Sequence, residues 1–206
     1  MLETMKKNYI FAVVRGKDAE DGYQISKGAI QGGIKNIEVA YTTPGATQVI
    51  ERLVEEFKED TSVVVGAGTV MDGEMATQAM EAGAKFLVSP HYSQEVMDVA
   101  KARDTYYLPG CGTVTEIVNA VNQGAPIVKL FPGGLLGPSF IKDVHGPLPD
   151  VELMPSGGVS LENIREWRDK GAVAVGVGSA LSKTVPEKGY AGVAEEAQKF
   201  VKALEG

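Results

Sequence analysis

The sequence repeats one unit along its length: a segment of helical period, a glycine, and a short run rich in β-branched residues. Glycine stands directly before the apolar run in IQGGIK, MEAGAK, VNQGAP and RDKGAV, where it can supply the left-handed residue that ends a helix. This alternation predicts parallel strands joined by crossover helices. The predicted strands are residues 9–15, 34–40, 62–68, 84–90, 105–110, 125–131, 151–156 and 172–178.

The number of repeated units favours one architecture. Eight similar units in 206 residues fit a closed (β/α)8 TIM barrel better than an open, doubly wound sheet. A chain of this length can bury a large core without disulfides or metals, and no linker or low-complexity segment interrupts the repeats. We therefore expect an α/β fold in which residues 1–206 form a single barrel domain.

Charge and hydropathy exclude two classes of partner. The net charge is −7 and no cluster of Lys and Arg is visible, so the electrostatic footprint of a nucleic-acid-binding protein is missing. No apolar run approaches the roughly 18 residues of a membrane span, and the first residues lack the pattern of a secretory leader. The single cysteine cannot form an intrachain disulfide. We expect a cytoplasmic protein that binds neither nucleic acid nor membrane.

One lysine, Lys129, interrupts the apolar run APIVKLF. Burying an ammonium group is costly, and lysine is almost never fully buried without a partner. Either its stem packs while its head reaches water, or its burial serves a purpose, because desolvation favours the neutral and nucleophilic amine. The sequence around Lys129 alone does not decide between the two interpretations.

The ends of the predicted strands favour the functional interpretation. In a barrel the chemistry lies at the C-terminal ends of the strands, and several ends here carry polar or conformationally special residues. Glu38 needs a partner there, either as an ion pair with Lys129 or Arg15, or as a general acid and base next to the amine. The residues expected at the mouth are Arg15, Glu38, Thr69, Pro90 and Lys129.

Two glycine-rich turns follow the last two predicted strands: PSGGVSLENI (155–164) and GVGSAL (176–181). Backbone N–H groups in such turns can bind anions, and the loops after strands 7 and 8 of a barrel commonly hold a phosphate. Glycine permits close approach of the backbone, and Ser160 is predicted to cap the helix that follows. The pair of turns therefore predicts a phosphate-bearing ligand.

The cysteine and the two histidines are not expected to be functional. Cys111 has no histidine nearby in the sequence to activate it and is predicted to be a small packed side chain. His91 and His145 share no spacing typical of metal ligands, although His91 could line the mouth. We therefore expect no metal.

The sequence resembles the 2-keto-3-deoxy-6-phosphogluconate (KDPG) and 4-hydroxy-2-oxoglutarate (KHG) aldolase family. The segments that carry the resemblance follow the order and spacing of that family over nearly the whole chain. They are VVRG, GGIKNIEV, VGAGTV, EAGAKFLVSP, LPGCGTVTE, VKLFPGG, MPSGGVSLENI and GVGSAL.

The resemblance implies a class I, metal-independent aldolase that needs no cofactor and assembles as a homotrimer. Lys129 matches the lysine that forms the Schiff base, and Glu38 the carboxylate that moves protons through a water. The other matches are Thr69 beside the carboxylate of pyruvate, Phe131 near the imine, Gly157, Gly158, Gly178 and Ser179 at the phosphate, and Ser156 where the family often has threonine.

One position departs from the family pattern. Many members have an arginine that holds the substrate's carboxylate where this chain has Thr42, and Arg15 could substitute for it. The expected reactions are cleavage of KDPG to pyruvate and glyceraldehyde 3-phosphate, or of KHG to pyruvate and glyoxylate. The alternatives are an aldolase for the galactonate epimer or another 2-oxo-3-deoxy acid, a phosphate-binding isomerase or decarboxylase without an imine, and a non-catalytic metabolite sensor.

Overall fold

The computed structural model describes residues 1–205, so Gly206, the last residue of the predicted domain, lies outside the described residues. Every predicted strand overlaps an observed one, and the predicted strand 105–110 falls on two of them. The strands are β1 (Ile10–Val14), β2 (Asn36–Ala40), β3 (Val64–Gly68), β4 (Phe86–Val88), β5 (Tyr106–Leu108), β6 (Gly110–Cys111), β7 (Val128–Leu130), β8 (Leu153–Pro155) and β9 (Val175–Val177).

Helices alternate with these strands along the chain, as the glycine-ended segments predict. They are α1 (Leu2–Asn8), α2 (Ala19–Gln31), α3 (Ala46–Glu56), α4 (Gly73–Glu81), α5 (Gln94–Ala102), α6 (Val114–Asn122), α7 (Gly133–Leu136), α8 (Pro138–His145), α9 (Ile164–Asp169), α10 (Ser179–Ser182), α11 (Val185–Lys188) and α12 (Ala191–Leu204). None of the helices in residues 1–205 has both the length and the hydropathy that a bilayer span requires.

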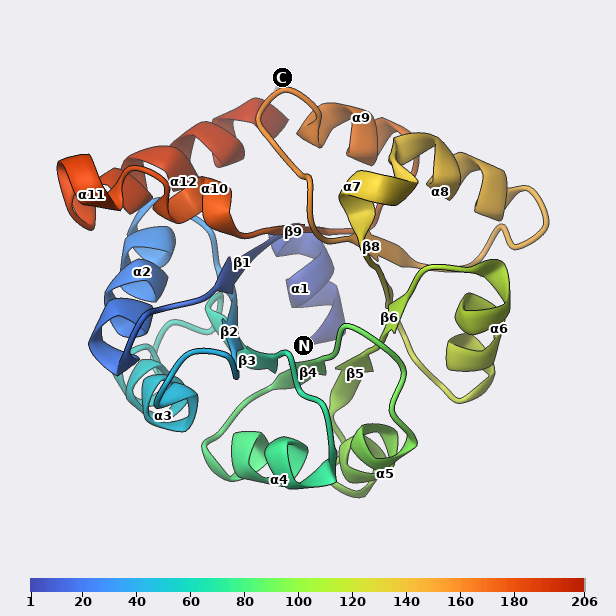
Figure 1. The fold of residues 1–206 in the computed structure, drawn as a ribbon, viewed down its shortest axis with the longest axis horizontal. Helices are drawn as coiled ribbons and strands as arrows, with labels where there is room; N and C mark the ends of the chain where they lie inside the picture. Colours follow the sequence, from blue (N-terminus) through green and yellow to red (C-terminus); the bar gives the residue numbers. More distant parts are fainter. Residues whose placement is uncertain (206) are drawn as a thin grey trace.

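The strands surround a common centre, with most of the helices outside them (Figure 1). All paired strands are parallel, and they form a six-stranded sheet in the order β5-β4-β3-β2-β1-β9 and a three-stranded sheet in the order β6-β7-β8. The α/β class and the barrel-like arrangement are therefore confirmed. The expected continuous eight-stranded sheet is not what residues 1–205 form, because pairing is interrupted at two places.

Both interruptions lie at prolines. Leu108 is the last residue of β5 that pairs with β4, and Gly110 is the first residue of β6 that pairs with β7. Pro109 lies between them and has no N–H to extend either ladder. The second interruption lies between β8 and β9. Val173 N–H donates to the Leu153 carbonyl, so the backbone of Leu153 faces β9. The backbone of Pro155, two residues later, faces the same way, but proline has no N–H to donate. One isolated bridge, Ser156 to Gly176, continues the contact between β8 and β9.

Alternate residues of each strand face two separate cores. The outer core lies between strands and helices, and it contains β7 residues Val128 and Leu130. The inner core fills the centre of the barrel and contains Ile127 and Phe11, whose ring meets that of Phe86 edge-on at 5.3 Å. Residues two positions along from an inner-core residue therefore also face the barrel interior.

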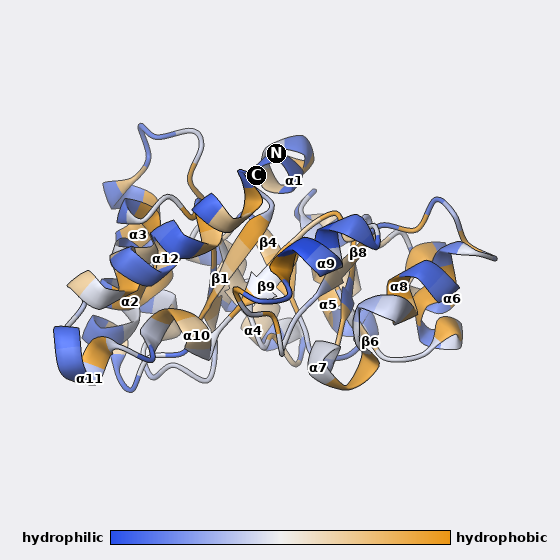
Figure 2. Ribbon diagram, turned by 90° about the horizontal axis from the view of Figure 1, so that it is seen from above, coloured by the Kyte–Doolittle hydropathy of each residue, from blue (hydrophilic) through white to orange (hydrophobic). Residues whose placement is uncertain are grey.

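Helix α1 closes one end of the barrel, opposite α7 and α10 (Figure 2). Met5 of α1 is fully buried in the inner core. The side chain of Asn36, also fully buried, donates to the Met5 carbonyl at 2.9 Å, and Lys6 forms an ion pair with Glu152 at 2.8 Å. Helix α1 therefore covers the end of the barrel at which the strands begin.

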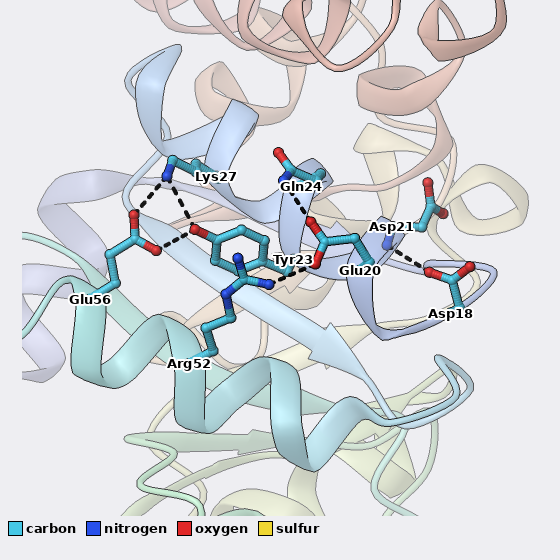
Figure 3. A network of polar contacts seen from close by, with 8 residues as sticks. All are labelled: Asp18, Glu20, Asp21, Tyr23, Gln24, Lys27, Arg52 and Glu56. Carbon is cyan, nitrogen blue, oxygen red and sulfur yellow. Dashed lines mark hydrogen bonds and ion pairs between the residues drawn. The ribbon is translucent and has the colours of Figure 1, made fainter.

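A polar network joins α2 to α3 on the outside of the barrel (Figure 3). The guanidinium of Arg52 lies 3.3 Å from the centre of the Tyr23 ring and also pairs with Glu20 at 2.7 Å. The Tyr23 hydroxyl donates to Glu56, which Lys27 contacts at 2.8 Å. The hydrogen bond from Lys27 is the largest cause that holds the pKa of Glu56 below its usual value. These contacts hold α2 against α3.

We predict that Met5→Ala lowers the free energy of unfolding by about 2–5 kcal/mol, because it leaves a cavity where α1 fills the inner core. Urea denaturation followed by circular dichroism measures the change. Lys7→Ala, at an exposed position of the same helix, is the control. Equal effects of the two substitutions would show that α1 does not close the core.

Candidate active site

The period of the strands turns Lys129 and Glu38 into the barrel. Lys129 stands two residues after the inner-core residue Ile127, and its neighbours Val128 and Leu130 face the outer core. Glu38 alternates in the same way between Ile37 and Val39, which belong to the outer core. A charged side chain at either position therefore has to lie in the interior.

The two side chains form a buried ion pair. Lys129 Nζ lies 3.5 Å from Glu38 Oε1, and the side chains are 3% and 0% exposed. This distance exceeds the about 2.7–2.9 Å of a charge-assisted hydrogen bond. Neither carboxylate oxygen of Glu38 has a hydrogen-bond partner among the described residues. Both carboxylate oxygens can therefore still accept a hydrogen bond.

Glycine and an aromatic ring shape the space around the pair. A Cβ on Gly68 of β3 would lie 2.3 Å from Glu38 Oε1 and 2.6 Å from its Cγ, so only glycine leaves room for this carboxylate. Lys129 Nζ lies 5.4 Å from the centre of the Phe131 ring, within the range of a cation–π interaction. The ring lies two residues beyond Lys129, toward the open end.

A pocket of about 290 Å³ adjoins the ion pair through Phe131. Side chains from the ends of β1 and β7 and the two glycine turns after β8 and β9 line it together. The residues expected at the site that lie in its wall are Arg15, Phe131, Ser156, Gly157, Gly158, Gly178 and Ser179. The structure thus brings together predicted residues from four distant parts of the chain.

Thr69 and Pro90 lie at the C-terminal ends of β3 and β4, outside the wall of that pocket. Thr69 has a φ of 54°, which is rare for a β-branched residue and indicates a backbone held in place by its surroundings. Pro90 contacts Gly110 so closely that a Cβ on the glycine would lie 2.2 Å from the Pro90 carbonyl. Both residues therefore belong to the mouth rather than to the glycine-lined pocket.

Arg15 is not the ion-pair partner of Glu38, which was one of the two partners considered for that carboxylate. Glu38 pairs with Lys129, and the Arg15 side chain points to the second glycine turn, where a Cβ on Gly178 would lie 3.8 Å from Arg15 Nη1. Gly16 N–H donates to the Thr43 hydroxyl at 3.0 Å and so fixes the loop that carries Arg15. Thr42, where the family often has arginine, is exposed.

The predicted cap at Ser160 is wrong. Helix α9 begins at Ile164, and Asn163 is the residue at its N-terminal boundary. The Asn163 side chain turns back, so that Oδ1 accepts from Ser160 N–H and Nδ2 donates to the Gly158 carbonyl, both at 2.8 Å. The sequence contained a signal for this turn, because an Asn three residues after a Ser-containing loop commonly bonds to backbone groups.

The family model for KDPG and KHG aldolases matches residues 1–194 of the chain. The chain belongs to the KDPG and KHG aldolase family. It is 30% identical to the 2-dehydro-3-deoxy-6-phosphogalactonate aldolase of Escherichia coli over 94% of this chain and 93% of that protein. It is 33% identical to the 2-dehydro-3-deoxy-phosphogluconate aldolase of Treponema pallidum over 81% of this chain and 79% of that protein.

The chain is also similar to a solved structure that contains a covalent intermediate. The KDPG aldolase of Legionella pneumophila, with pyruvate captured at low pH as a covalent carbinolamine intermediate, superposes with a TM-score of 0.85 at 25% identity. The match covers 95% of each chain. A carbinolamine is the adduct of an amine with a carbonyl carbon, so that aldolase forms a covalent bond to pyruvate through an amine.

The remaining reactive residues of this aldolase family member lie apart from the ion pair. Cys111 is buried in the outer core, as predicted, and burial raises the pKa of its thiol to about 12. His145 contacts the Val151 carbonyl at 2.9 Å, and His91 is exposed after β4. Within residues 1–205, no group of three His, Cys, Asp or Glu residues is arranged to hold a metal ion.

We predict that Cys111 reacts very slowly with a thiol reagent at pH 8 in the folded protein. Its pKa lies well above that pH, so nearly all of the thiol stays protonated, and the thiolate is the reactive form. Absorbance of the released chromophore measures the rate, and the urea-unfolded protein is the control, with a thiol pKa near 8.5. Equally fast labelling of both forms would contradict the burial of Cys111.

Proposed function

We propose that this protein is a class I aldolase that cleaves a phosphorylated 2-oxo-3-deoxy sugar acid, or KHG, to pyruvate and an aldehyde. The observation that carries the proposal is the buried amine of Lys129, 3.5 Å from a carboxylate and beside a pocket lined by glycine turns. Membership of the KDPG and KHG aldolase family supports the same reaction.

Lys129 is the proposed nucleophile. Its neutral amine attacks C2 of the 2-oxo acid to form a carbinolamine, and loss of water produces a protonated imine. The imine withdraws electrons from C3, so the C3–C4 bond breaks and its electron pair remains on the pyruvate part as an enamine. Protonation of the enamine at C3 and attack of water at C2 release pyruvate and restore the amine.

Glu38 is the proposed general acid and base. Its Oε1 lies 3.5 Å from Lys129 Nζ, and neither of its oxygens has a hydrogen-bond partner among residues 1–205. The carboxylate can therefore take the C4 hydroxyl proton during cleavage, directly or through a water. The same group can later help protonate the enamine. We place Phe131 against the imine and Thr69 beside the carboxylate of pyruvate, with Pro90 at the mouth nearby.

The glycine-lined pocket is the proposed site of the distal phosphate. Its wall combines Ser156 and two turns, Gly157–Gly158 and Gly178–Ser179, whose backbones are accessible to a ligand. Arg15 supplies positive charge in the same wall, where it would contact the phosphate and not the carboxylate that the family arginine at position 42 holds. Binding energy from a remote phosphate can orient the reacting carbons over Lys129.

KDPG and its galactonate epimer are the two leading substrates. The relative from Treponema pallidum is named for the gluconate compound, and the relative from Escherichia coli for the galactonate compound. We propose KDPG or KHG first and the galactonate epimer as the alternative. Release of pyruvate from each compound, coupled to NADH oxidation by lactate dehydrogenase, separates them.

We also propose that the two sheets act together as one closed (β/α)8 barrel domain over residues 1–206. The bridge between Ser156 and Gly176, and the direct passage of the chain from β5 to β6, support closure at both interruptions. The family resemblance supports assembly as a homotrimer, and the expected location is the cytoplasm.

Borohydride reduction in the presence of pyruvate tests the nucleophile. We expect a reduced pyruvyl group attached to Lys129, located by mass spectrometry of peptides, and no adduct in Lys129→Ala, which should also lose cleavage. Lys142→Ala, at an exposed position of α8, is the matched control and should label like the wild type. Turnover without an adduct would instead indicate an isomerase or decarboxylase, and phosphate-ester binding without turnover a sensor.

Gly68→Ala tests the placement of Glu38. The added methyl group would overlap the Glu38 carboxylate, so we expect kcat for cleavage to fall by about 10²-fold or more, within the range assigned to general acid–base catalysis. Gly73→Ala is the control and should retain activity, because a Cβ on Gly73 would lie 3.4 Å from its nearest neighbour, the Cβ of Glu95. Wild-type kcat in folded Gly68→Ala would refute the proposed role of the carboxylate.

A further inference from the structure

Asn163 uses both ends of its side-chain amide inside the first glycine turn. Its Oδ1 accepts from Ser160 N–H and its Nδ2 donates to the Gly158 carbonyl, each at 2.8 Å. The two partners determine the orientation of the amide, because an N–H has to meet an oxygen and a carbonyl has to meet an N–H. Only an amide side chain can satisfy both groups at once from this position.

The turn that Asn163 holds has a demanding backbone. Gly157 and Gly158 are both left-handed, with φ values of 87° and 75°, a conformation that other residues rarely adopt. Glycine loses more conformational freedom than any other residue when it is fixed in one state. A turn with two consecutive left-handed glycines therefore needs contacts from its surroundings to keep one shape.

The other side of the turn is held by the segment that follows Lys129. Gly133 N–H donates to the Ser156 carbonyl at 2.8 Å, and a Cβ on Gly158 would lie 2.6 Å from the Cα of Gly134. Two glycine pairs thus pack backbone against backbone between the ends of β7 and β8. The side chain of Asn163 holds the turn from the segment that follows it, through Gly158 and Ser160.

We propose that Asn163 is a positioning residue for the phosphate monoester of the substrate, and this inference rests on the proposed function. Asn163 does not belong to the pocket wall, whereas Gly157, Gly158 and Ser160 do. By holding the Gly158 carbonyl and the Ser160 N–H, its amide keeps the remaining groups of the turn directed at the pocket. Its loss weakens recognition of the phosphate and leaves the chemistry at Lys129 intact.

Two kinds of measurement separate phosphate recognition from chemistry. Cleavage of the phosphorylated 2-oxo-3-deoxy acid and inhibition by inorganic phosphate both depend on the turn. Trapping of pyruvate on Lys129 by borohydride requires no phosphate. For Asn163→Ala we expect KM and the inhibition constant of phosphate to rise about tenfold, as the loss of two hydrogen bonds implies, with kcat and the trapping rate near wild type.

Asn163→Asp keeps an acceptor for Ser160 N–H but cannot donate to Gly158 and adds a negative charge beside the phosphate. It should raise the same two constants at least as much and trap pyruvate normally. Asn119→Ala, at an exposed position of α6, is the control for removal of an asparagine and should behave as wild type. Thermal unfolding confirms that each variant is folded.

Two results would overturn the inference. If both Asn163 variants keep wild-type KM and phosphate inhibition, the turn holds its shape without the amide. If either folded variant loses pyruvate trapping as strongly as phosphate affinity, Asn163 supports the whole site and not the phosphate turn. Failure of the wild type to trap pyruvate would instead overturn the proposed aldolase chemistry, so the two failures are distinguishable.

Discussion

The ion pair between Lys129 and Glu38 is the contact on which the site depends. Both charges lie in the barrel interior, where an unpaired ammonium or carboxylate would be strongly unfavourable. The pair can exist because β2 and β7 turn these residues inward and Gly68 leaves space for the carboxylate. Helix α1 and the inner-core side chains close the interior below the pair. The amine is therefore removed from bulk water.

The backbone, more than the side chains, builds the other half of the site. Gly133 and Gly134 meet Ser156 to Gly158 with no side chain between them, so the segment after Lys129 and the first glycine turn are in direct contact. A backbone surface presents N–H groups at fixed positions and suits a phosphate, whose oxygens accept several hydrogen bonds. The side chains at Arg15 and Asn163 then adjust the charge and the shape of this surface.

The two interruptions of the sheet occur next to residues of the proposed site. The Pro109 carbonyl accepts from Lys129 N–H, and Ser156, which lines the pocket, comes directly after Pro155. A proline removes one donor from the ladder, so the regular pairing of the sheet stops at each of these positions. Loss of ladder pairing at these points thus coincides with the positions where the chain needs to build the site rather than extend a strand.

The sequence by itself determined the class of fold, the approximate positions of the strands, and the placement of Glu38 and Lys129 near the C-terminal ends of their strands. These follow from local periodicity, because a strand alternates its faces and a glycine ends a helix wherever they occur. Only the tertiary structure decided that Glu38 pairs with Lys129, that Arg15 turns to Gly178, that Asn163 and not Ser160 organises the turn, and where the sheet is interrupted. Most of these outcomes depend on distances between residues far apart in the chain, and the turn depends on the direction of one side chain. The period of a single strand or helix contains neither kind of information.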